Sequence, residues 1–197
     1  MAEQAIHIIA GLGNPRSGYA DTRHNAGAWF VEQLARDAGQ LLRPEKKFQG
    51  LYAKVLWQGH TLHLINPQTY MNRSGQSVKA LADFFKIAPE QILIAHDELD
   101  LPAGTARFKK TGGHGGHNGL RDLINHFGSK DFPRLRVGIG HPGDSKQVTN
   151  YVLSKAGKRE REAIDAVLDE ASRTLPDAIT GDWGSAMNRL HSFRFDD

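Results

Sequence analysis

One histidine in a polar segment and one acidic segment of the chain have the residue types needed for acid–base chemistry. His24 lies in Thr-Arg-His-Asn, and residues 96–100 read His-Asp-Glu-Leu-Asp, which contains Asp97 and Asp100. An imidazole titrates near neutral pH and can act as a general base when a partner on its second nitrogen fixes the tautomer. A carboxylate of residues 96–100 could be that partner. The same carboxylates could instead bind magnesium, or the segment could be an acidic turn, and the residues alone do not separate these alternatives.

Residues 111–119 form the most unusual segment, Thr-Gly-Gly-His-Gly-Gly-His-Asn-Gly, with five glycines in nine residues. Glycines let a ligand approach the main chain closely, so this loop is a candidate part of a binding site. His114 and His117 also raise the alternative of a metal-dependent hydrolase or nuclease that uses them with Asp97 and Asp100. No carboxylate follows these histidines at helical spacing, and a loop of this flexibility holds metal ligands poorly. A mobile loop without chemistry is the third interpretation.

Other chemistries are disfavoured by motifs that the sequence lacks. Residues 11–15 read Gly-Leu-Gly-Asn-Pro after a predicted strand, but a dinucleotide-binding fingerprint needs glycine where this chain has Arg16. A P-loop needs Gly-Lys-Ser or Gly-Lys-Thr, whereas Gly18 is followed by Tyr19. The chain has no cysteine and no Gly-x-Ser-x-Gly elbow, which disfavours cysteine and α/β-hydrolase serine nucleophiles. A hydrolase of this sequence is therefore expected to use water that a histidine activates.

Positive charge is concentrated in one part of the chain. The 197 residues carry a formal net charge of +3 at pH 7. Residues 100–136 alone contain seven lysines and arginines against three aspartates, a local charge of +4 that leaves the rest of the chain at −1. A basic cluster of this kind is either a solvated face or a patch that contacts phosphate.

Composition disfavours membrane and secretory roles. No stretch approaches the roughly 18 apolar residues of a transmembrane helix. The first residues lack the basic and apolar regions of a secretion signal. The absence of cysteine fits a reducing compartment. We therefore expect a cytoplasmic protein without a membrane partner.

The elements that must position the candidate residues can be predicted from apolar periodicity. Strands are expected at residues 6–10, 52–57, 61–65, 91–95 and 135–139, the second and third of them forming a hairpin. Helices are expected at residues 27–38, 74–85, 120–127, 164–175 and 187–193. Alternating strands and helices favour an α/β fold with a mixed, mostly parallel twisted sheet surrounded by helices. No repeat, linker or break in composition divides the chain, so residues 1–197 are expected to form a single domain.

The polar segments are expected to meet at one edge of this sheet. Residues 11–25, 66–74 and 96–100 each follow a predicted strand directly, and residues 112–119 open a predicted helix. In sheets of this class, ligands bind in the crevice beyond the carboxyl ends of the parallel strands. The topology therefore predicts a site at that edge, built from these four segments.

Five motifs also occur in a specific order along the chain. They are Gly-Leu-Gly-Asn-Pro with Thr-Arg-His-Asn within 11–25, Pro-Gln-Thr-Tyr-Met-Asn at 67–72, His-Asp-Glu-Leu-Asp at 96–100, Gly-Gly-His-Gly-Gly-His-Asn-Gly at 112–119, and Arg-Leu-Arg-Val-Gly-Ile-Gly-His-Pro-Gly at 134–143. Together they resemble the bacterial peptidyl-tRNA hydrolases. The resemblance implies a cytosolic, monomeric, metal-independent esterase that releases peptides from peptidyl-tRNA and so recycles the tRNA. It also implies no cofactor and no obligatory protein partner.

The resemblance further implies roles for individual residues. In the catalytic set, His24 corresponds to the base that activates water, Asp97 to the aspartate that supports it, and Asn14 to the asparagine that helps distinguish N-blocked from free aminoacyl-tRNA. Other matched positions bind substrate around the scissile ester or line the site: Tyr19, Tyr70, Met71, Asn72 and Asn118. Two basic positions match residues that hold tRNA phosphate: Lys109 and Arg136.

Overall fold

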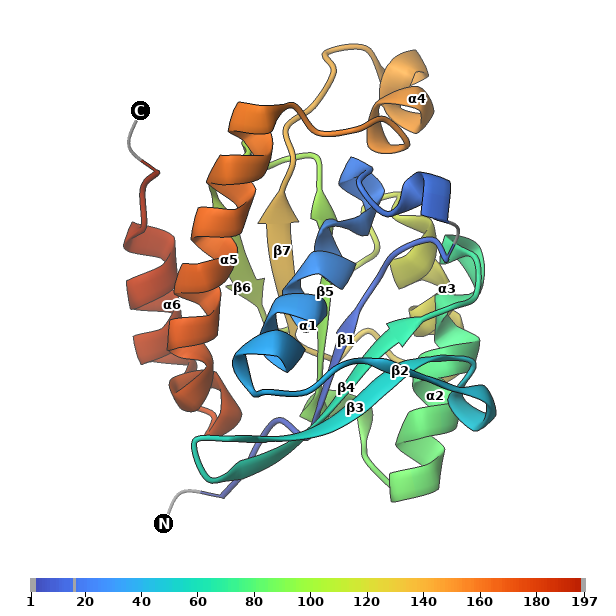
Figure 1. The fold of residues 1–197 in the computed structure, drawn as a ribbon, viewed down its shortest axis with the longest axis vertical. Coiled ribbons are helices and arrows are strands. Elements are labelled where there is room, and N and C mark those ends of the chain that lie inside the picture. Colours follow the sequence, from blue (N-terminus) through green and yellow to red (C-terminus); the bar gives the residue numbers. More distant parts are fainter. Residues whose placement is uncertain (1–2, 16, 196–197) are drawn as a thin grey trace.

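The computed structural model describes residues 3–15 and 17–195, which form a seven-stranded sheet with helices on both faces (Figure 1). The strands are β1 (Ile8–Gly11), β2 (Arg43–Glu45), β3 (Gly50–Trp57), β4 (His60–Pro67), β5 (Ile92–Glu98), β6 (Ala106–Lys109) and β7 (Arg134–Gly138). The helices are α1 (Ala26–Asp37), α2 (Ser74–Phe85), α3 (Asn118–Phe127), α4 (Val148–Val152), α5 (Lys158–Ile179) and α6 (Trp183–Ser192). The order of the strands in the sheet is β2-β3-β4-β1-β5-β7-β6.

The four central strands run parallel, and both edges of the sheet are antiparallel. β1 pairs in parallel with β4 and β5, and β5 pairs in parallel with β7. β2, β3 and β4 form an antiparallel meander at one edge, and β6 runs antiparallel to β7 at the other. The predicted α/β fold with a mixed sheet is confirmed. Parallel pairings make up three of the six, so they dominate the centre of the sheet rather than its whole width.

Helices cover both faces of the sheet because each presents an apolar stripe to it. On one face lie α1, α5 and α6 (Figure 1). They bury side chains such as Phe30, Ile164 and Leu190. On the other face, α2 and α3 bury Leu81 and Leu123. Removing these apolar side chains from water is the main free-energy gain that holds the layers together. None of the helices in the described part of the chain is both long and apolar enough to cross a membrane.

All five predicted strands and all five predicted helices are present, with shifted boundaries. Three short elements have no counterpart among the predictions: β2, β6 and α4. They contain three, four and five residues, too few for a period to stand out from the neighbouring sequence. In β6, Ala106 and Phe108 are buried while Arg107 and Lys109 are exposed, which is the alternation of a half-buried strand.

The beginning of α1 lies very close to the end of β5. A Cβ atom on Gly27 would collide with the backbone carbonyl of Ala95. Only glycine therefore fits where the helix crosses the strand. This close approach brings the turn before α1, which carries His24, against the strand end that carries Asp97.

Candidate active site

A cleft of about 810 Å³ opens where the parallel strands end. Asn14 and His24 reach it from the segment after β1, Asn72 from the segment after β4, Asp97 from the end of β5, and His117 from the glycine-rich loop before α3. The four polar segments that the sequence placed at this edge therefore do converge, as predicted. The carboxyl ends of parallel strands share one edge of a sheet, which is why this convergence follows from topology.

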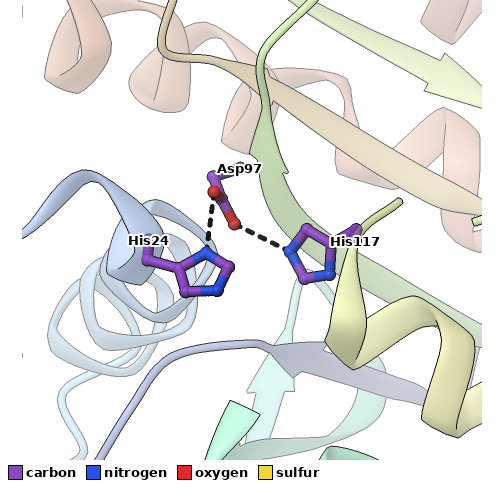
Figure 2. Close-up of side chains that lie close together, drawn as sticks. All are labelled: His24, Asp97 and His117. Atoms are coloured by element: carbon purple, nitrogen blue, oxygen red, sulfur yellow. Dashed lines mark hydrogen bonds and ion pairs between the residues drawn. The ribbon is translucent and has the colours of Figure 1, made fainter. Parts of the chain in front are cut away.

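Asp97 lies between two histidines in the wall of the cleft (Figure 2). Its Oδ2 is 2.8 Å from Nδ1 of His24, and its Oδ1 is 2.8 Å from Nε2 of His117. The side chain of Asp97 is 2% exposed, against 13% for His24 and 9% for His117. The carboxylate is thus sealed behind two rings, and of the three groups His24 is the most open to solvent.

His117 is held in one tautomer by helix α3. It is the N-cap residue of that helix, and its Nδ1 accepts hydrogen bonds from the backbone N–H groups of Gly119 and Leu120. Because Nδ1 accepts, the ring proton lies on Nε2, which donates to Asp97. Gly119 permits this packing, since a Cβ atom there would lie 2.7 Å from the sulfur of Met71. His117 therefore orients Asp97 from the side opposite His24.

His24 has the geometry of a general base. Its Nδ1–H donates to the carboxylate of Asp97, which leaves the lone pair of Nε2 available. Within residues 3–15 and 17–195, Nε2 has no hydrogen-bond partner. Burial lowers the pKa of His24, but the charge of Asp97 and its hydrogen bond raise it more, so the pKa lies above the ordinary value of 6.5. Asp97 therefore fixes the tautomer and makes the ring a stronger base.

Asp97 itself remains ionised at any physiological pH. Burial raises the pKa of this carboxyl, but the electrostatic attraction of His24 and His117 and the hydrogen bonds from both rings lower it far below the ordinary range. A buried carboxylate with both oxygens bonded to N–H groups is satisfied without water. It is thus a fixed negative charge behind the ring of His24.

The side-chain amide of Asn14 has a fixed orientation. Its Oδ1 accepts a hydrogen bond of 2.8 Å from the backbone N–H of Met71. The backbone of Asn14 is held as well, because its N–H and C=O both bond to the side chain of Asn25. With Oδ1 occupied, the Nδ2 group of Asn14 is the part available to the cleft, and it is a donor.

The other residues implied to bind substrate are distributed unevenly. Tyr70 and Asn72 are exposed and line the cleft, and Met71 lines it although its side chain is buried. Asn118 also lines the cleft, and its Oδ1 accepts a bond of 3.3 Å from Arg121. Tyr19 lies in a short 3₁₀ turn and is not among the described residues that line the cleft.

Lys109 and Arg136 lie beside the cleft rather than in its lining. Arg136 donates from Nε to Glu98, which does line the cleft, over 2.8 Å. In the antiparallel pairing of β6 and β7, Arg107 lies opposite Arg136 and Lys109 lies opposite Arg134. Directly opposed residues project from the same face of a sheet, so Arg107, Lys109 and Arg136 form a basic rim next to the cleft. Arg134 is buried beneath this rim, where it donates to the carbonyls of Gly112 and Lys130.

The set of residues considered for a metal site is not brought together. His117 and Asp97 meet, but the third residue of their cluster is His24, and neither His114 nor Asp100 belongs to it in the described part of the chain. The Nδ1 atom of His114 accepts from the backbone N–H of Gly116. Both oxygens of Asp97 and both ring nitrogens of His117 are already hydrogen-bonded. The donor set therefore fits a hydrogen-bonded chain better than a metal centre.

One wall of the cleft was missed by the sequence patterns. It comes from residues 145–153, a 3₁₀ turn (Ser145–Gln147) followed by α4, and it contributes apolar side chains such as Val148, Val152 and Leu153. The region lies between the last predicted strand and the long helix α5, where no motif and no sustained period is present. The end of Gly-His-Pro-Gly at 140–143 was the nearest available signal.

These features define a class of protein. An α/β sheet whose parallel strands end at a cleft, with a histidine bonded to a buried aspartate in the cleft wall, is an arrangement suited to an enzyme that activates water by general-base catalysis.

The chain belongs to the peptidyl-tRNA hydrolase family, whose sequence model matches residues 8–197. It is 68% identical over 191 residues to the peptidyl-tRNA hydrolase of Marinobacter nauticus, covering 97% of each chain. It is 62% identical to that of Chromohalobacter salexigens, covering 95% of this chain and 97% of the relative. The crystal structure of peptidyl-tRNA hydrolase from Acinetobacter baumannii matches with a TM-score of 0.93 and 48% identity, covering 98% of this chain and 99% of the other.

Proposed function

We propose that this chain hydrolyses the ester bond between a peptide and tRNA, with His24 as the general base. The chain is a member of an enzyme family described by that activity. The assignment of the base depends on the hydrogen bond between His24 Nδ1 and Asp97. This bond leaves the second ring nitrogen, Nε2, available to accept a proton, and His24 lines the cleft. A bound water at Nε2 would be the nucleophile.

The reaction balances with these groups alone. Nε2 of His24 takes a proton from water as the water oxygen attacks the ester carbonyl carbon. The tetrahedral intermediate then expels the ribose oxygen, which takes the proton back from the imidazolium. The products are a peptide carboxylic acid and a tRNA with a free hydroxyl. General-base catalysis of this kind contributes about 10²–10⁴-fold to the rate.

Asn72 is the proposed donor to the developing oxyanion. Its side chain is exposed in the cleft, on the turn that follows β4. One donor aimed at the oxyanion contributes roughly 2.7–4 kcal/mol to the stability of the transition state. Tyr70 and Met71, its neighbours, supply surface to the same side of the cleft.

Asn14 and Asn118 are proposed to select N-blocked substrates. The Nδ2 group of Asn14 is a donor, so it pairs with the acyl carbonyl of a peptide and opposes the ammonium group of a free aminoacyl residue. Asn118 can pair with the substrate main chain from the other side of the cleft. Once the substrate excludes water from the cleft, a substrate without the matching group leaves this donor unpaired, which costs about 1–3 kcal/mol.

Lys109 and Arg136 are proposed to contact tRNA phosphate. They belong to the basic rim beside the cleft, with Arg107. Phosphate contacts position an RNA without reading its sequence, which suits an enzyme that accepts many tRNAs. Tyr19 does not line the cleft itself. We therefore propose that it contacts the substrate at the outer margin of the site.

The proposal includes the setting of the reaction. The seven strands share one sheet, which supports a single domain over residues 1–197, with residues 1–2 and 196–197 lying outside the described part. We propose that this domain acts as a monomer in the cytoplasm, without a cofactor or an obligatory protein partner. All of the catalytic and binding groups named above come from one chain.

The test compares an N-acetylated aminoacyl-tRNA with its unblocked counterpart in the presence of EDTA. The unaltered chain is expected to cleave only the blocked substrate. His24→Ala should lose about 10²–10⁴-fold in turnover with little change in tRNA affinity. His60→Ala is the matched control, because His60 lies at the other end of β4, before the cleft is reached. Full activity of a folded His24→Ala would remove His24 as the base, and activity that appears only with added divalent metal would favour the metal-dependent alternative.

A further inference from the structure

The apolar wall of the cleft depends on a helix that is too short to be stable alone. α4 contains five residues, and isolated helices of this length do not persist in water. Yet three of the apolar side chains that line the cleft come from residues 145–153: Val148, Val152 and Leu153. Some other part of the chain must hold this segment in place.

Arg23 provides that support. Its Nε and Nη2 donate to the two carboxylate oxygens of Glu160, over 3.0 and 2.9 Å, so the pair is bidentate. Its Nη1 donates to the backbone carbonyl of Tyr151 and to the hydroxyl of Ser154. One guanidinium therefore joins the first turn of α5 to Tyr151 near the end of α4 and to Ser154 just after that helix.

Several further contacts reinforce this clamp. The guanidinium of Arg23 lies 4.0 Å from the centre of the Tyr151 ring. The backbone N–H of Arg23 donates to the carbonyl of Ser154. Tyr151 in turn donates its hydroxyl proton to the carbonyl of Ile139, just beyond β7. The Arg23 side chain is 10% exposed, so its charge is neutralised inside the protein rather than by solvent. Glu160 is more open, at 35% exposed, but the bidentate geometry of the pair still fixes the orientation of the guanidinium.

Arg23 also shares a 3₁₀ turn (Arg23–Asn25) with His24. The clamp thus fixes the apolar wall relative to the base itself. Water activated by His24 attacks the ester carbonyl, so this carbonyl must lie next to the His24 ring. The side chain of the esterified amino acid is attached one carbon away from the carbonyl and therefore also lies near the ring. Of the cleft's apolar lining residues, most belong to this wall, with Met71 and Leu99 as the others.

We propose that Arg23 is a positioning residue, which holds α4 as the wall against which the side chain of the esterified amino acid packs. This inference rests on the proposed function. The wall acts on binding and not on proton transfer, because His24 takes its orientation from Asp97 independently. Loss of the clamp therefore raises KM for substrates with a large apolar esterified residue and leaves kcat nearly unchanged.

The experiment measures kcat and KM for N-acetylphenylalanine and N-acetylglycine esterified to the same tRNA, so that effects on tRNA binding cancel in the ratio. Arg23→Met removes the clamp, and Glu160→Gln weakens it at a more exposed position. Arg161→Met is the matched control, since Arg161 is the next residue on α5 and its side chain contacts Trp29, Asp21 and Asp165. Hydrogen exchange of the backbone amides of residues 148–154 follows the wall directly, without substrate.

For Arg23→Met we expect the preference for the phenylalanyl substrate to fall about tenfold, a loss of apolar contact that appears in KM. Glu160→Gln should lose less, and Arg161→Met should match the unaltered chain. Exchange at residues 148–154 should accelerate in the first two variants only.

An unchanged substrate ratio and unchanged exchange in the folded clamp variants would overturn the role of Arg23. If Arg23→Met does not fold, Glu160→Gln decides the question in the same way. A fall in kcat for both substrates alike would also contradict a role in binding. Failure of the unaltered chain to cleave either substrate would instead overturn the proposed function, so the two results are distinguishable.

Discussion

Two largely buried histidines at opposite parts of the sheet show how one residue type acquires different chemistry. His24 lies at the carboxyl edge, with Nδ1 bonded to Asp97. His63 lies in β4, where its Nδ1 is 2.7 Å from the hydroxyl of Tyr52 and its ring stacks on Phe85 at 4.1 Å. Both rings are removed from most of the solvent, and each has one nitrogen paired. They differ in whether the partner carries a charge.

The partner decides the direction of the pKa shift. Burial lowers the pKa of both rings. At His63 the positive charges of Lys54 and His7 lower it further, to about 4, and within the described residues no carboxylate opposes them. At His24 the charge of Asp97 outweighs burial, and the pKa rises above 6.5. The comparison teaches that an aspartate, and not burial alone, turns a core histidine into a base near neutral pH.

Asp97→Asn is expected to have the largest effect on this comparison. The variant leaves His24 buried without a negative partner, so turnover should fall by about 100-fold or more. The catalytic form is the neutral ring, which is populated above its pKa. In the unaltered chain we expect kcat/KM to fall with acid around a midpoint above pH 6.5, the raised pKa of His24. In the variant this midpoint should move below pH 6.5, because burial lowers the pKa of His24 and no charge of Asp97 raises it.

The control for this experiment is Asp122→Asn. Asp122 also lies beside a histidine, His126, but on α3 outside the cleft lining. Its pH profile should match that of the unaltered chain. An acid limb that stays fixed in Asp97→Asn would mean that the limb reports a group other than His24.

His63→Phe tests the other side of the comparison through stability. The pKa of His63 is about 4 in the folded chain and near 6.5 when unfolded, so the unfolded state binds the extra proton between these values. The contribution of His63 to stability is therefore complete above pH 6.5 and is lost as the pH falls toward 4, by up to about 3 kcal/mol. His63→Phe keeps an aromatic ring against Phe85 and removes this loss.

Urea unfolding between pH 7 and pH 4 measures the difference. The free energy of unfolding of the unaltered chain should fall more steeply with acid than that of His63→Phe. His60→Phe, on the same strand, is the control and should follow the unaltered chain. If the free energy of unfolding falls equally with pH in His63→Phe and in the unaltered chain, protonation of His63 does not destabilise the fold.

The sequence predicted the meeting of His24 with the acidic segment because both follow parallel strands, whose ends share one edge. The sequence could not show which of His114 and His117 contacts Asp97, since both lie in the same glycine-rich segment. Only His117 caps α3, and the cap is what aims its Nε2 at Asp97. That orientation depends on how α3 packs at Gly119, which is a property of the assembled fold.

The clamp at Arg23 shows the same limit in another form. Arg23 and Glu160 are 137 residues apart, and charged pairs of this kind leave no periodic signal. α4 and β6 are short elements stabilised by neighbours rather than by their own pattern. Long elements and motif order could be predicted from the sequence, whereas contacts among short segments depended on the tertiary structure.

His117→Asn is expected to reduce turnover by about tenfold, which is less than the loss expected for Asp97→Asn. The reason is that the variant loses one hydrogen bond to the charged carboxylate of Asp97. Asparagine is a good N-cap, so α3 should remain intact, while the shorter side chain cannot reach Asp97. The measurement pairs single-turnover rates with urea unfolding. A loss of turnover at unchanged stability separates orientation of Asp97 from support of the helix, and unchanged turnover would show that His24 alone orients the carboxylate.

Tyr52→Phe should have the smallest effect, because it removes a partner from a histidine that performs no chemistry. The variant loses one hydrogen bond to His63, which contributes about 1 kcal/mol, and the ring contact between Tyr52 and Phe48 is kept. Turnover and its pH profile should equal those of the unaltered chain, while the free energy of unfolding at pH 7 falls slightly. Val55→Ala, on the same strand, would test whether any loss of packing gives the same result. An altered pH profile of turnover in Tyr52→Phe would contradict the separation of the two histidines, since it would couple His63 to the cleft across the sheet.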